Sequence, residues 1–95
     1  MIIISQDKTE IINFNNIESI WICSDEEGIF TIEATADTNT SLGKYKTEER
    51  AKEVLQEIIK KYVATESFKV TVNRLSDEVG AIGIKNSFIY EMPEE

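Results

Sequence analysis

Apolar and polar residues alternate through the first half of the chain, in short segments that polar turns separate. Apolar side chains occupy every second position of residues 30–36, which is typical of a strand with one solvent-facing side. Residues 17–24 carry apolar side chains on both faces and predict a central strand, while the wholly apolar residues 1–4 predict a strand buried on both sides. With shorter segments at residues 11–14 and 42–45, the pattern predicts an antiparallel meander.

The period of the pattern changes near Thr47. Apolar residues then recur at offsets 0, 3, 4, 7, 8 and 11, the spacing that places side chains on one face of a helix. They are Ala51, Val54, Leu55, Ile58, Ile59 and Tyr62. Thr47 is suited to the N-cap, and Glu48 and Glu49 favour the positive end of the helix dipole. The spacing predicts an amphipathic helix over about residues 47–63.

Two further strands are expected after this helix. Phe68, Val70 and Val72 alternate with polar residues, and residues 88–92 predict a last strand. Residues 73–87 are the least predictable stretch: one helical turn could begin at Ser76 and end at Gly80, and a glycine interrupts the apolar run that follows.

These elements predict a single α+β domain over residues 1–95. Because one helix cannot bury its apolar face alone, we expect it to pack on one face of an antiparallel β-meander of about five to seven strands. A sheet curled into a half-barrel, with the helix closing one end, satisfies the same pattern. A chain of 95 residues is long enough for one hydrophobic core.

The charge of the chain narrows the classes of partner. Eighteen acidic and ten basic residues give a net charge of -8, and histidine is absent. Repulsion from phosphates makes nucleic acid and anionic membranes unexpected partners. The single cysteine and an N-terminal segment without a signal-peptide pattern predict a cytoplasmic protein. No apolar run reaches the roughly 20 residues of a membrane helix.

Candidate chemical sites are few, and each has a simpler structural interpretation. The run Asp25, Glu26 and Glu27 could bind a divalent cation, but it lacks the spacing of a calcium loop and is expected to form a solvated turn. Cys23 could act as a nucleophile only beside a base that lowers its pKa, and histidine is absent. A buried, inert thiol is therefore expected.

Two other features match ligand sites only in part. Gly80 and Gly83 fit neither phosphate-binding glycine pattern and favour a loop. Lys44, Lys46 and Arg50 concentrate positive charge near the helix start. They are expected to serve solubility and local pairing with Glu48 and Glu49, with a small anionic ligand as the alternative. The sequence thus predicts no catalytic, metal-binding or cofactor-binding residue, no cofactor and no enzyme activity.

Sites of contact with other proteins are more strongly indicated than catalytic or ligand sites. Four apolar residues of the unassigned segment are the candidate contact with an unknown protein partner. They are Val79, Ala81, Ile82 and Ile84. The alternative is that they fold back under the core, as most apolar residues do. A meander also has two edges, and an uncovered edge allows a homodimer to form by strand pairing.

Several segments of the sequence resemble known proteins. They are residues 1–8 (MIIISQDK), 13–17 (NFNNI), 42–58 (LGKYKTEERAKEVLQEI) and 90–95 (YEMPEE). In these segments, of which the third is the most specific, the chain resembles a group of small, functionally unassigned proteins of Firmicutes and their prophages. The resemblance implies a small cytoplasmic protein, leaves a phage origin open and carries over no site residue.

Three classes of function follow from these observations. The first expectation is a non-catalytic protein-interaction or accessory module. The second is an acidic mimic of DNA that inhibits a nucleic-acid-binding protein, which the net charge of -8 motivates. The third is a small-ligand binder or enzyme, which requires an enclosed pocket.

Overall fold

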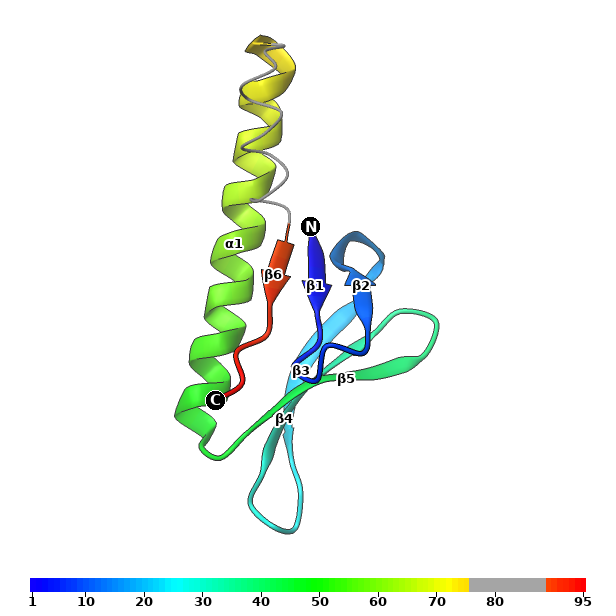
Figure 1. The fold of residues 1–95 in the computed structure, drawn as a ribbon, viewed down its shortest axis with the longest axis vertical. Coiled ribbons are helices and arrows are strands. Elements are labelled where there is room, and N and C mark those ends of the chain that lie inside the picture. The colour runs from blue at the N-terminus through cyan, green and yellow to red at the C-terminus, as the bar shows by residue number, and fades with distance from the viewer. Residues whose placement is uncertain (76–88) are drawn as a thin grey trace.

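Six strands, one long α-helix and a short 3-10 helix make up the described part of the chain (Figure 1). The structure is a computed structural model, which describes the backbone of residues 1–75 and 89–95 and the side chains of residues 1–66 and 89–95. In chain order the elements are β1 (Ile2–Ile4), β2 (Ile11–Asn13), η1 (Phe14–Asn16), β3 (Ser19–Ser24), β4 (Phe30–Thr35), β5 (Asn39–Tyr45), α1 (Glu48–Leu75) and β6 (Ile89–Glu91). They confirm the α+β class.

The described strands form two three-stranded sheets, so the prediction of a single meander was wrong, and they form no half-barrel. The first sheet has the order β2-β1-β6, with β2 antiparallel and β6 parallel to β1. The second is the antiparallel series β3-β4-β5. Both edges of β1 are occupied, because Ile3 pairs with Ile12 on one side and with Tyr90 on the other. β1 is therefore the central strand of the first sheet, and β3 belongs to the second.

Two strands are less buried than their apolar sequences predict. Ile3 is 0% exposed, but Ile2 on the opposite face is 39% exposed, so β1 is not buried on both sides. β3 lies at the edge of its sheet and not at the centre. Ile20 and Ile22 pack against the core, whereas Trp21 on the other face is half-buried. Apolar residues on both faces of β3 therefore do not indicate a central strand.

Helix α1 packs against β4 and β5 through most of the apolar face that the spacing predicts, but Ile59 of that face is 43% exposed. Ala51, Val54 and Ile58 are each 0% exposed and join a core that includes Ile32 of β4. The Thr47 hydroxyl accepts a hydrogen bond from the third helical N–H at 3.1 Å, which confirms the N-cap. In Figure 1, β6 (red) lies between α1 and β1 (blue). The helix thus covers one sheet and flanks the other.

The helix continues to Leu75, so the strand predicted at residues 68–72 was wrong. No glycine or proline lies between Glu48 and Leu75 to end it. Thr65 is 0% exposed and continues the buried stripe one heptad after Ile58. Because threonine is polar, the spacing of apolar residues does not show that the buried face of the helix continues to Thr65.

A β-bulge in β5 brings two consecutive residues toward the core. Ile32 of β4 pairs with Gly43, but the next residue, Glu33, pairs with Ser41, which leaves Leu42 as the extra residue. Leu42 and Gly43 are both buried as a result.

The ring of Tyr45 packs directly against the bulge. A Cβ atom at Gly43 would lie 2.9 Å from Tyr45 Oη and 3.3 Å from Gln6 Cβ. Tyr45 is 2% exposed, and its hydroxyl donates to the Pro93 main-chain oxygen at 2.9 Å, so the ring has little room to move. Space, rather than backbone conformation, therefore favours glycine at position 43.

We expect Gly43→Ala to lower the free energy of unfolding by about 1–3 kcal/mol, the usual effect of overpacking a filled site. Urea denaturation followed by circular dichroism measures it. Ser41→Ala, on the exposed side of the same strand, should stay within about 0.5 kcal/mol of the wild type. A Gly43→Ala variant as stable as the wild type would show that the Tyr45 ring adapts to the added methyl group.

Candidate interaction site

The side chain of Gln6 closes the outer edge of β5. The Gln6 main-chain N–H donates to the Leu42 oxygen at 2.8 Å. Its Oε1 accepts from the Lys44 N–H at 2.8 Å, and its Nε2 donates to the Lys44 oxygen at 2.9 Å. The amide thus binds both main-chain groups of one residue, as a neighbouring strand does. Nε2 also lies 3.1 Å from the Pro93 oxygen and 2.9 Å from the Glu94 oxygen, which ties the segment after β6 to the same edge.

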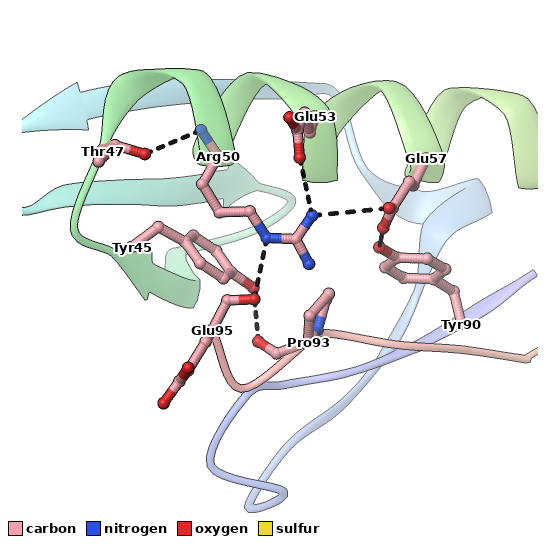
Figure 2. A network of polar contacts seen from close by, with 8 residues as sticks. All are labelled: Tyr45, Thr47, Arg50, Glu53, Glu57, Tyr90, Pro93 and Glu95. Carbon is pink, nitrogen blue, oxygen red and sulfur yellow. Dashed lines mark hydrogen bonds and ion pairs between the residues drawn. The ribbon is translucent and has the colours of Figure 1, made fainter.

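Arg50 holds the end of that segment against the start of α1 (Figure 2). Its Nε donates to the Glu95 main-chain oxygen at 2.9 Å. Its Nη1 lies 3.1 Å from Glu53 Oε2 and 3.7 Å from Glu57 Oε1. Glu57 also accepts a hydrogen bond from the Tyr90 hydroxyl at 2.7 Å. One guanidinium therefore connects two carboxylates of the helix with the chain that follows β6.

The tyrosine hydroxyls of this network favour their neutral form. Desolvation is the largest cause that raises the pKa of Tyr45 from 10.0 to about 12. Desolvation, followed by the hydrogen bond to Glu57, raises the pKa of Tyr90 above its usual value of 10.0. Both hydroxyls donate a hydrogen bond in the folded chain, so both contacts depend on the bound proton.

We expect the free energy of unfolding to fall as the pH rises above 10. Both tyrosines have a higher pKa in the folded chain than in the unfolded chain, so their contribution is complete below pH 10 and is lost as the pH rises, toward about 12 for Tyr45. Urea midpoints measured across this range test the expectation. Tyr45→Phe and Tyr90→Phe should each make the fall less steep, and an unchanged slope in both variants would contradict it.

The basic residues near the helix start share their surroundings with acidic ones. Lys44, Lys46 and Arg50 line a hollow of about 220 Å³ together with Glu94 and Glu95. Arg50 also forms ion pairs within α1. Carboxylates around the hollow disfavour an anionic ligand. Local pairing is seen for Arg50, but with Glu53 and Glu57 rather than with the predicted Glu48 and Glu49.

Cys23 lies on the outer face of β3 and is half-buried, so the expectation of a buried thiol was wrong. Its Sγ donates to Glu33 Oε2 of β4 at 2.9 Å. The hydrogen bond to Glu33, followed by desolvation, raises the pKa of the Cys23 thiol. The thiolate is the nucleophilic form of cysteine, so this environment opposes a catalytic role.

Glu33→Gln should increase the rate at which iodoacetamide alkylates Cys23 in the folded protein. Removal of the negative charge lets the pKa of the thiol fall, and the thiolate fraction rises. The rate is measured at several pH values from neutral to mildly alkaline. Glu18→Gln, at the other end of β3, should keep the wild-type rate. Equal rates for Glu33→Gln and the wild type would show that Glu33 does not control this thiol.

The acidic turn between β3 and β4 forms its own hydrogen bonds. Asp25 Oδ1 accepts from the main-chain N–H groups of Glu27 and Ile29, each at 2.9 Å. Gly28 follows with a φ of 80°, which favours glycine. The prediction of a turn is confirmed. In the part of the chain that the structure describes, no three side chains of the metal-binding types come together.

The free edge of β3, here called the β3 edge, is the candidate interaction site that the structure shows. Ser19–Ser24 pairs with β4 alone, and no main-chain hydrogen bond joins it to another described segment. Its six residues include no charged residue and no proline. Natural edge strands use such residues to prevent pairing, so the β3 edge presents unpaired N–H and C=O groups without the usual protection.

The other strand edges of the described chain are shorter or occupied. Gln6 occupies the edge of β5, and Lys44 lies along it. β2 and β6 have three residues each, and β6 lies beside α1 (Figure 1). β3 is thus the longest free edge in this part of the molecule.

A hollow of about 340 Å³ adjoins β3 on the core side of its sheet. Ile22, Ser24 and Phe30 line it from the sheet, and Glu48 and Lys52 line it from α1, where their side chains form an ion pair at 2.9 Å. Ile22 therefore borders both the core and this hollow, and its side chain is only half-buried.

The residues predicted to contact a partner lie outside the described residues. They are Val79, Ala81, Ile82 and Ile84, and Gly80 and Gly83 lie outside them as well. The sequence analysis missed the β3 edge because it placed β3 at the centre of a sheet. The signal that could have indicated the edge is the uncharged run from Ser19 to Ser24.

Comparison with known proteins does not assign the chain to a family. Neither the family models nor the curated proteins nor the solved structures include a match to it. No described helix combines the length and the hydropathy that crossing a bilayer requires. The β3 edge is therefore argued from geometry and sequence alone.

Proposed function

We propose that this chain is a non-catalytic protein-interaction module that binds its partner by strand pairing at the β3 edge. One observation carries the proposal: six uncharged residues form a strand with a hydrogen-bonded neighbour on one side only, among the described residues. Main-chain hydrogen bonds supply affinity in this mode of binding, and alternate side chains supply specificity.

The side chains of the β3 edge are suited to such a contact. Trp21 lies on the outer face and is half-buried, and tryptophan is among the residues that contribute most to interfaces. Ile20 and Ile22 lie on the core face, beside the hollow that Ile22 lines. The side chains of a partner strand would contact apolar side chains of β3 on both faces of the sheet.

The acidic charge gives weaker support to a mimic of DNA. Mimicry requires free carboxylates in rows, whereas Glu48, Glu53 and Glu57 of α1 pair with Lys52 or Arg50. The charge is better explained by solubility.

Affinity capture with the tagged full chain tests the proposal. Trp21→Lys places a charge on the β3 edge without touching the core, and it should abolish capture of the proteins that the wild type retains from its native cells. Ser41→Lys, on the outer face of β5, is the matched control and should retain them. Capture that is equal for Trp21→Lys and the wild type would contradict binding at the β3 edge.

A further inference from the structure

We propose that the strand paired at the β3 edge is β3 of a second copy of this chain. The inference rests on the proposed function, since it names the partner at the same site. The two strands run antiparallel about a two-fold axis at Trp21, and the two second sheets join into one continuous sheet.

The faces of the sheet restrict the register of this pairing. A two-fold axis normal to the sheet keeps the two outer faces on the same side, so residues that lie opposite each other must come from the same face. With the axis at Trp21, the tryptophans of the two copies are opposite each other on the outer face. Ile20 then lies opposite Ile22 of the second copy on the core face, and Ser19 lies opposite Cys23.

Charge selects this register among those that the faces allow. With the axis at Trp21, Glu18 lies opposite Ser24 of the second copy, and no two acidic residues are opposite each other between residues 17 and 25. A shift of two residues in one direction brings Glu18 opposite Glu26, and like charges in that position are destabilising. The opposite shift leaves Ile20 opposite Ile20 of the second copy but brings the charged Glu18 opposite the apolar Ile22.

The same argument favours a second copy as the occupant. Two copies of a chain with a net charge of -8 repel each other through most of their surface. Of the three strands in the second sheet, β3 alone carries no charged residue, since β4 contains Glu33 and β5 contains Lys44. Identical strands can therefore meet here without opposing like charges.

On the core face, apolar side-chain contacts between the two copies add to the main-chain pairing. Helix α1 packs against β4 and β5, and beside β3 the hollow lined by Ile22 and Phe30 is left. In the proposed register, Ile20 of the second copy extends beside Ile22 at this hollow. The isoleucines of both copies then form one continuous cluster across the two-fold axis.

Variants with opposite charges at Trp21 test together whether the partner is a second copy and whether the two-fold axis lies at Trp21. Light scattering over a dilution series of the full chain should give twice the chain mass at high concentration. Trp21→Lys and Trp21→Glu should each give the single mass, because like charges then lie opposite each other, and their equimolar mixture should recover the double mass. Ser41→Lys should behave as the wild type, and circular dichroism confirms that each variant is folded.

A cross-link tests the register without adding charge. Ser19→Cys places a thiol opposite Cys23 of the second copy, at the roughly 4.5–5.5 Å between Cβ atoms of directly opposed residues, which a small adjustment brings to disulfide distance. Mild oxidation should convert this variant to a covalent dimer. Ser41→Cys, on the same face but at the opposite edge of the sheet, should remain a single chain under the same conditions.

The outcomes separate this inference from the proposed function. A wild type that keeps the single mass at all concentrations overturns the second copy, and so do single Trp21 variants that keep the double mass. If capture from native cells still depends on Trp21 in that case, the β3 edge binds a different protein and the proposed function stands. If neither the mass nor the capture responds to Trp21, both are wrong.

Discussion

The hydrogen bonds of the Gln6 amide are the contacts on which the arrangement of the two sheets depends. Gln6 follows β1 of the first sheet, yet its side chain binds both main-chain groups of Lys44 at the outer edge of the second sheet. Its Nε2 also reaches the oxygens of Pro93 and Glu94. One neutral side chain thus joins both sheets with the segment after β6, and among the described residues it leaves β3 as the free side of the second sheet.

Much of the local structure could be predicted from the sequence. The N-cap at Thr47, the buried face through Ala51, Val54 and Ile58, and the turn at Asp25 all follow from periodicity and side-chain chemistry. The end of α1 could not be predicted, because Thr65 continues the buried stripe as a polar residue. The periodic pattern shows only which helix positions are apolar, whereas the burial of a side chain depends on the element that packs against it.

The candidate site was beyond prediction for a different reason. Whether a strand is central or at an edge depends on which segments pair, and here β2 pairs with β1 alone while β3 pairs with β4 alone among the described strands. Ile20, Trp21 and Ile22 have the same apolar character in either position. Only the strand pairing itself shows that β3 joins β4 and lies at the edge of the second sheet.

The pairing of β1 with β6 also has a consequence for the order in which the chain folds during its synthesis on the ribosome. The hairpins of β3, β4 and β5 are local and can form as soon as these residues emerge. The bond between Gln6 and Pro93 spans 87 residues, so β1 must wait with one side open until translation reaches the last strand. In that interval Ile3 is without its Tyr90 neighbour, and the nascent chain is most open to wrong partners.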